Sequence, residues 1–422
     1  MSTGDAEVST AEPGAGQPAE VQAPHIVVDV IDSREGYRAA VEAIAGGTGP
    51  IAIDAERASG YRYSQRAYLI QIYRRGAGTF LFDPPAVGDF TELNDTIRNV
   101  EWVLHAASQD LACLREVGLD PVSIFDTELG ARLAGLARVG LGTVVEELLG
   151  VHLAKEHSAA DWSTRPLPQS WLVYAALDVE LLVDLRFAVA ELLERAGKTE
   201  IARQEFAATL AKEPKPANPD AWRKLSGLHT IRTARNLAVA RGLWRARDDY
   251  AQEIDTAPGR LLPDASIVAA ARTLPATKND LAGLKEFSGR ASRSQLPRWW
   301  AAIEAGLASE DLPPLRVHGD SIPPARAWAD RNPEADKRLK AARASMSEIS
   351  SELDIPVENL LTPDLLRRVA WAPPEPLTVD AVREVLAHSG ARPWQLDATA
   401  QPIVAAFVEA VQSDPAQGEP EP

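Results

Sequence analysis

The stretch Gly49–Glu56, GPIAIDAE, decides the fold because it is the first clear strand of a series. Ile51 and Ile53 alternate with smaller residues, and a period of two is typical of a β-strand. The strand ends on two acidic residues, Asp54 and Glu56. It therefore predicts both a sheet and a position at which carboxylates gather.

Further short apolar runs follow this strand and predict the rest of a sheet. A short connection with glycine suits a hairpin between two of them. The expected strands and hairpin are Ala67–Tyr73 (AYLIQIY), Arg74–Gly78, Thr79–Asp83 (TFLFD) and Glu101–His105 (EWVLH). Ser108 is expected to cap the next helix. Helical spacing follows at Leu141–Leu149 and in one long segment, 168–195. This alternation predicts an α/β domain over residues 25–210.

The pattern of the residues after 210 predicts helices and no strands. Residues 211–220 are a Pro-rich linker, and the spacing of apolar residues beyond it is helical. Short motifs recur at an offset near 100 residues, which predicts two copies of one helical module at 221–306 and 325–412. The biased composition at 1–24 and 413–422 predicts disordered tails.

Composition excludes several classes of protein. The chain has 422 residues, ordinary globular composition and one cysteine, Cys113, so it has neither an internal disulfide nor a cysteine-built metal site. Its apolar runs are shorter than the roughly 18 residues that a membrane-spanning helix requires. We therefore expect a cytoplasmic protein without a membrane partner.

The net charge of −16 is distributed unevenly. Residues 215–305 carry 15 Lys and Arg against 9 Asp and Glu, whereas residues 306–422 carry 11 against 19. Arginines at this spacing in the first helical module are candidate phosphate contacts, although a solvated helix face explains them equally well. The candidates are Arg232, Arg235, Arg241 and Arg245. The acidic second module leaves a role in binding a protein partner open.

Asp54 and Glu56 lie two residues apart, so their carboxylates point to one face of the strand. Two facing carboxylates repel each other unless a cation neutralises them, and hard divalent cations prefer oxygen ligands. An exposed strand end also explains such a pair. The metal-site interpretation therefore needs support from other parts of the chain.

Three more residues give that support. Asp110 follows a strand and enters the first turn of a helix, where the helix dipole alone also favours an acid. Tyr174 and Asp178 are four residues apart and share one helix face. Asp178 lies in an apolar stretch, where an acid is costly to bury without a partner such as a metal ion. A core aromatic residue remains an alternative for Tyr174.

Taken together, these residues resemble the tyrosine-bearing branch of the DEDD superfamily of 3′–5′ exonucleases, most closely the ribonuclease D family. Asp54 and Glu56 match the first motif of the superfamily, Asp110 the second, and Tyr174 with Asp178 the third. The segment Asp161–Leu167 (DWSTRPL) is the most family-specific part. The helical modules resemble the tandem HRDC modules of that family, the second one divergently. Glu128 and Leu181 depart from the usual residues of the family.

The resemblance implies a ribonuclease-H-like fold, with a mixed sheet flanked by helices and followed by all-α modules. It also implies hydrolysis at the 3′ end of single-stranded RNA, such as tRNA precursors or other stable RNA, with two Mg²⁺ or Mn²⁺ ions held by the four acids. Tyr174 would orient the attacking water. A 3′–5′ DNA exonuclease and a catalytically silent nucleic-acid-binding scaffold remain alternatives.

Overall fold

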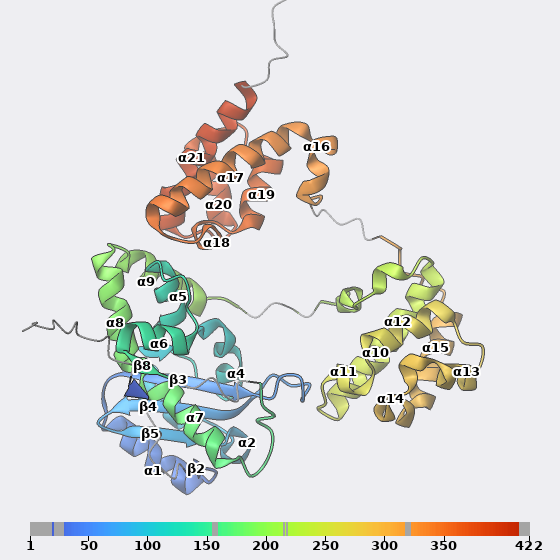
Figure 1. Cartoon of the computed structure of the whole chain (residues 1–422), viewed down its shortest axis with the longest axis horizontal. Coiled ribbons are helices and arrows are strands. Elements are labelled where there is room, and N and C mark those ends of the chain that lie inside the picture. Colours follow the sequence, from blue (N-terminus) through green and yellow to red (C-terminus); the bar gives the residue numbers. More distant parts are fainter. Residues whose placement is uncertain are drawn as a thin grey trace, which may run out of the picture.

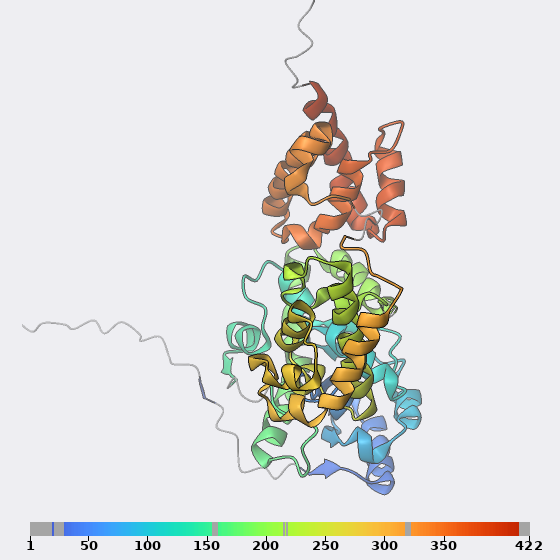
Figure 2. The same ribbon diagram turned by 90° about the vertical axis from the view of Figure 1, so that its right-hand side faces the viewer.

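The computed structural model describes residues 19–20, 29–153, 159–213, 216, 218–316 and 322–412. An α/β part is followed by two helical bundles (Figures 1 and 2). The tails expected at 1–24 and 413–422 lie outside the described residues, apart from Ala19–Glu20, which forms β1. None of the described helices combines the length and the apolar character needed to cross a membrane.

The α/β part is built on a six-stranded mixed sheet in the order β2-β5-β4-β3-β6-β7. The antiparallel pairs are β3–β4 and β4–β5, and the other neighbours are parallel. This arrangement and the helical bundles confirm the predicted fold class. The strands of the sheet are β2 Val30–Ile31, β3 Thr48–Arg57, β4 Ala67–Arg75, β5 Gly78–Phe82, β6 Trp102–Leu104 and β7 Ile124–Asp126, and β8 Val151–His152 pairs with β1 outside it.

Both faces of the sheet are covered, because alternate residues of β4 enter different clusters. Ile70 and Ile72 pack in the large core that includes α1 and α3, whereas Leu69 packs against α7. A strand that is covered on both faces needs apolar residues on both, which explains why the central strands β3 and β4 are mostly apolar in sequence. The helices of this part are α1 Arg34–Ala45, α2 Pro84–Val87, α3 Thr91–Ile97, α4 Leu111–Glu116, α5 Thr127–Leu133, α6 Leu141–Leu149, α7 Gln169–Glu180, α8 Leu182–Arg195 and α9 Thr199–Leu210.

Two local expectations were wrong. The long segment 168–195 forms two helices, α7 and α8, which meet at Leu181. Ser108 lies inside a short 3₁₀ turn, η1 (Ala107–Gln109), and α4 begins only at Leu111, after Asp110. The serine is therefore not the cap of the helix, because the chain makes the η1 turn first and Asp110 occupies the N-cap position of α4.

The two helical bundles repeat one order of helices. Three helices begin at residues 234, 258 and 264 in the first bundle and at 333, 357 and 363 in the second, a constant offset of 99. The first bundle contains η2 Ala221–Lys224, η3 Leu228–Thr230, α10 Ala234–Glu253, α11 Pro258–Leu261, α12 Asp264–Thr273, α13 Lys278–Gly283, η4 Lys285–Phe287, α14 Arg290–Ser294 and α15 Leu296–Ala308. The second contains η5 Ala325–Ala327, α16 Trp328–Arg331, α17 Pro333–Leu353, α18 Val357–Leu360, α19 Pro363–Trp371, α20 Val379–His388 and α21 Pro393–Gln412.

Polar contacts tie each bundle to the α/β part, and the apolar core of the second bundle is also continuous with that of the α/β part. The first one meets the β3–β4 loop and the start of β4, where Asp255 accepts hydrogen bonds from the Ser64 amide (2.8 Å) and the Tyr68 hydroxyl (3.1 Å). The second one meets α9, where Arg392 donates two hydrogen bonds of 2.6 Å to the carboxylate of Glu205. The bundles are thus held at two different positions around the α/β part.

Candidate metal and nuclease site

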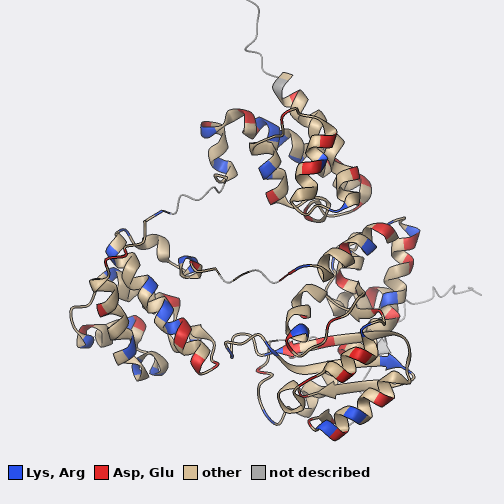
Figure 3. Ribbon diagram, turned by 180° about the vertical axis from the view of Figure 1, so that it is seen from behind, with Lys and Arg blue, Asp and Glu red and all other residues tan. Residues whose placement is uncertain are grey.

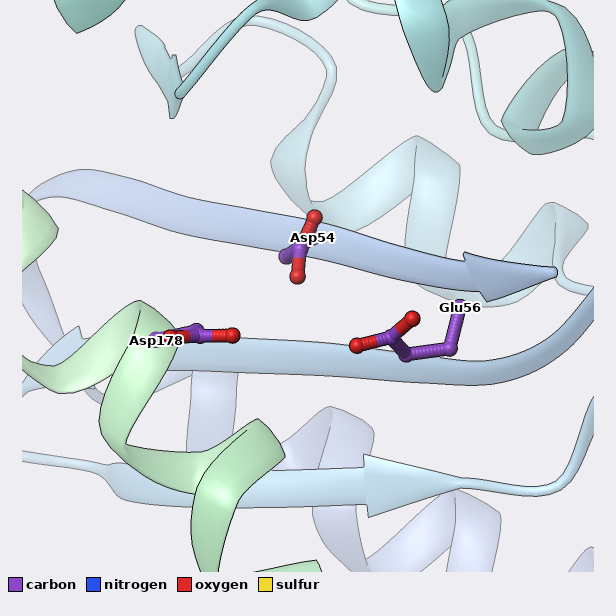
Figure 4. A group of neighbouring side chains, drawn as sticks. All are labelled: Asp54, Glu56 and Asp178. Carbon is purple, nitrogen blue, oxygen red and sulfur yellow. The ribbon is translucent and has the colours of Figure 1, made fainter. Parts of the chain in front are cut away.

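Three carboxylates converge above the centre of the sheet (Figure 4). Asp54 and Glu56 project from the same face of β3, and Asp178 projects toward them from α7. One ligand oxygen from each of the three residues lies within 4.8 Å of the other two. Helix α7 brings Asp178 there because it packs across β4, β5 and β3 through Leu172, Ala175 and Ala176.

Asp110 lies beside this group without belonging to it. The residue is buried and sits between η1 and α4. Burial, followed by repulsion from Asp54, raises the pKa of Asp110, and the charge of Asp110 in turn adds to the raised pKa of Glu56. Its carboxylate lies 3.7 Å from the guanidinium of Arg57, the residue after Glu56. Asp110 therefore faces the same space from the opposite element.

Burial and mutual repulsion make these acids hard to ionise. Burial, reinforced by the neighbouring carboxylates, raises the pKa of Glu56 to about 10 and the pKa of Asp178 to about 8. Burial also raises the pKa values of Asp54 and Asp110. Arg57 opposes this effect at Asp54, Glu56 and Asp110. The cluster thus needs more positive charge than Arg57 supplies before all four groups can ionise at neutral pH.

A divalent cation fits this donor set. All the ligand atoms are carboxylate oxygens, which suit hard ions. Nitrogen and sulfur ligands that would favour softer metals are absent from the group found among the described residues. The residues expected to hold the metal thus form a suitable site, with Asp110 at its edge.

Tyr174 lies one helical turn before Asp178 on α7 and hydrogen-bonds to its carboxyl group. Burial, followed by the charges of Asp178 and Glu56, raises the pKa of the Tyr174 hydroxyl well above its usual value. The hydroxyl consequently stays protonated at neutral pH. It can orient a water molecule, but it cannot serve as the base that removes a proton from it.

The family-specific segment 161–167 anchors α7 in place. Arg165 pairs with Asp83 through two hydrogen bonds (2.6 and 2.9 Å) and donates a third to the backbone oxygen of Tyr68 (2.8 Å). Trp162 is fully buried, and its ring lies against that of Trp171 in α7. The segment therefore ties the start of the helix that carries Tyr174 and Asp178 to the sheet.

The four candidate arginines do not form one common surface. Arg232 and Arg245 are exposed, whereas Arg235 donates to the backbone oxygen of Ser309 and Arg241 forms an ion pair with Asp311 (3.0 Å). Basic and acidic residues are interspersed on the helices of the bundle (Figure 3). Two of the four arginines thus bind their own chain.

Sequence reasoning missed Arg57; the segment Phe125-Asp126-Thr127 resembles the family and is expected to be structural, but the partners of Asp126 were not predicted. Arg57 could have been found from its position next to the D-x-E pair, because a cation there meets the same acids. Asp126 accepts hydrogen bonds from the backbone amides of Ala106, Ala107, Glu128 and Leu129. A single sequence carries no signal for such a contact between distant segments.

The sheet and the acidic cluster define a nuclease of the 3′–5′ exonuclease class, and the comparison with protein families agrees. Residues 28–194 match the family model described as 3′–5′ exonuclease. Residues 236–303 match the HRDC domain model, and residues 321–407 match the model described as 3′ to 5′ exonuclease C-terminal domain. The HRDC model thus matches the first helical bundle, and a different model matches the second.

Relatives identify the family. Ribonuclease D of Jannaschia sp. is 31% identical over 291 residues, 67% of this chain and 73% of that protein. Ribonuclease D of Cronobacter turicensis is 30% identical over 322 residues, 72% of this chain and 85% of that protein. This chain belongs to the ribonuclease D family and is a 3′–5′ exonuclease.

Solved structures extend the similarity over the helical bundles. A crystal structure of a protein from Bifidobacterium adolescentis is 36% identical, with a TM-score of 0.84 over 93% of this chain and 100% of that one. Escherichia coli RNase D, described as an exoribonuclease involved in structured RNA processing, is 24% identical, with a TM-score of 0.67 over 91% of this chain and 99% of that one. The latter comparison shows a shared fold.

Proposed function

We propose that this protein shortens single-stranded RNA from its 3′ end by hydrolysis at the site formed by Asp54, Glu56, Asp110 and Asp178, with tRNA precursors or other stable RNA as natural substrates. The convergence of three carboxylates within 4.8 Å carries the proposal. The relatives named ribonuclease D support RNA as the substrate.

We assign the metal-binding role to the four acids. Asp54, Glu56 and Asp178 would hold divalent cations, and Asp110 would act from the edge of the group. Two bound Mg²⁺ or Mn²⁺ ions would supply a more acidic water molecule and would neutralise charge on the phosphate. The four carboxylates would be ionised in that state, because the positive charge would offset the repulsion between them.

Tyr174 positions the attacking water in this proposal. Its hydroxyl stays protonated and donates its hydrogen to the carboxylate of Asp178, so its oxygen can accept a hydrogen bond from the water. Arg57 would keep Asp110 in place and reduce the repulsion that a phosphate meets on approach.

Product analysis tests the proposal. Purified protein is incubated with 5′-labelled single-stranded RNA or DNA of the same sequence, with Mg²⁺, Mn²⁺ or chelator. We expect a metal-dependent ladder that shortens from the 3′ end of RNA. Asp178→Asn should abolish the ladder, whereas Asp184→Asn, an exposed acid on the neighbouring helix, should preserve it.

The remaining outcomes identify the alternatives. An equal ladder on DNA would leave the sugar preference open, because the acidic cluster contains no group dedicated to the 2′-hydroxyl. Binding of RNA without cleavage in any metal would indicate a silent scaffold. Cleavage by the Asp178→Asn protein as fast as by the wild type would contradict the assigned site.

A further inference from the structure

Gln71 is a fully buried glutamine in β4, and it lies directly opposite Asp54 in the antiparallel pair of β3 and β4. Residues opposite each other in such a pair have their side chains on the same face, with Cβ atoms about 5 Å apart. Gln71 therefore shares the face from which Asp54 projects into the acidic cluster (Figure 4). Its partner in β5 on the other side is Leu81, which packs in the same apolar cluster as residues of α7.

The amide group of Gln71 lacks a hydrogen-bond partner within the described part of the chain. Its Nε2 and its Oε1 are both buried and unpaired, and no other side chain of that part has two such atoms. Gln395, which is equally buried in the second bundle, accepts from the amide of Arg392 (3.0 Å) and donates to the backbone oxygen of Asn359 (2.8 Å). An unpaired buried amide lowers stability, because it has given up its hydrogen bonds to water. The packing of the sheet thus gives no reason for an amide at position 71.

The carboxylate of Asp54 offers the acceptor that this amide needs. It already accepts a hydrogen bond from the backbone amide of Ala55, and a carboxylate has about four lone-pair positions in total. Carboxylates that bind metal ions usually accept hydrogen bonds from neighbouring groups as well, and these bonds fix their orientation. Since Gln71 and Asp54 are direct neighbours across two strands, rotation about the side-chain bonds of Gln71 brings its amide to this carboxylate.

We propose that Gln71 is a positioning residue of the metal site, whose amide N–H donates to the carboxylate of Asp54 when divalent cations are bound there. This inference rests on the metal-binding role proposed for Asp54. The amide would hold the carboxylate in the orientation that the cations require, and it would gain the partner that it otherwise lacks. A neutral donor suits this position, because an acid would add to the repulsion within the cluster and a basic side chain would compete with the cations.

Gln71→Met separates this role from a structural one. Methionine has nearly the volume and the unbranched shape of glutamine, so the variant removes the amide and keeps the packing. Gln395→Met is the matched control, because it removes an equally buried amide that has both of its partners. Both variants are made in the full-length protein. Calorimetric titration with Mn²⁺ measures metal affinity, and thermal unfolding with chelator measures the stability of the metal-free protein.

We expect Gln71→Met to improve stability and to impair metal binding. The melting temperature of the metal-free protein should rise by roughly 2 to 4 °C, because the unpaired amide has been removed. Binding of Mn²⁺ should weaken by about tenfold, the scale of losing a group that orients a metal ligand. Gln395→Met should instead lower the melting temperature and leave the affinity for Mn²⁺ unchanged.

Two results would overturn the inference. An unchanged affinity for Mn²⁺ in the Gln71→Met protein would show that Asp54 is oriented without help from Gln71. A lower melting temperature or a failure of this variant to fold would show that the amide serves the fold, as in Gln395.

A wild-type protein that does not bind Mn²⁺ would overturn the metal site itself, and the role of Gln71 with it. Neither readout involves RNA or cleavage. A failure of the proposed exoribonuclease activity therefore remains distinguishable from a failure of the role assigned to Gln71.

Discussion

Tyr174 acts through one hydroxyl group in the assigned site. Since burial and the neighbouring acids raise its pKa, the hydroxyl stays protonated, and we propose that it orients the attacking water without taking up a proton from it. We expect Tyr174→Phe to lower kcat by about 10- to 100-fold with less than about a threefold change in KM, because the lost hydrogen bond acts on the attacking water. Steady-state kinetics on labelled RNA measure both. A large rise in KM with an unchanged kcat would contradict this role.

The acids of the site make stability depend on pH and metal together. Their folded pKa values lie above the unfolded value of about 4, so between roughly pH 4 and pH 8 the unfolded chain holds fewer protons than the folded chain. The free energy of unfolding of the metal-free protein must therefore fall as pH rises through this window. A bound divalent cation removes the cost of ionising the acids.

We accordingly expect Mn²⁺ to raise the melting temperature more at pH 8 than at pH 6. Thermal unfolding with Mn²⁺ or chelator at both pH values measures this difference. Asp178→Asn should reduce the metal effect at pH 8, and Asp184→Asn should keep it. A metal effect of the same size at both pH values would show that the buried acids do not bind the ion.

At the scale of elements, the strands and the grouping of the acidic residues were predictable because both leave local patterns. The four expected strands exist, since each is a run of apolar residues, and Asp54 and Glu56 share a face because of strand periodicity. The strands β2 and β7 were not predicted, because strands of two and three residues are too short to show an alternating pattern. The loop before Asp110 could not be predicted, because its geometry is set by Asp126 from β7.

Asp126 connects β7, α5 and the loop that leads to Asp110. The loop passes through Ala106, whose φ of 63° lies in the left-handed region that non-glycine residues rarely adopt, and Asp126 binds the amides there while it also caps α5. We expect Asp126→Ala to destabilise the protein by about 2 kcal/mol and to lower kcat, because Asp110 loses its support. Ser33→Ala, which removes the cap of α1, should lower stability and leave kcat unchanged.

Denaturant unfolding and steady-state kinetics on the two variants separate these effects. If Asp126→Ala loses stability but keeps the wild-type kcat, the loop holds Asp110 without help from β7.

At the scale of the whole molecule, the second bundle is fixed to α9 by one acid with several partners. Glu205 is buried and accepts hydrogen bonds from Arg392 and from the indole of Trp394 (2.7 Å). Lys198, nearby, donates to the backbone oxygens of Leu133 and Asp354 and so joins the same two parts. Without this carboxylate the indole N–H of the buried Trp394 and part of the Arg392 guanidinium would lose their partner.

Glu205→Ala should therefore weaken docking of the second bundle by about 3 kcal/mol, the scale of breaking a buried ion pair. We expect a larger radius of gyration in small-angle scattering and faster proteolysis between residues 309 and 322, because the bundle moves away from α9 while keeping its own core. Glu200→Ala removes an exposed acid of the same helix, which pairs only with Arg203 and Gln204 among the described residues, and should change neither readout. Unchanged scattering of the Glu205→Ala protein would show that the apolar core continuous between α9 and the second bundle is sufficient to hold the bundle.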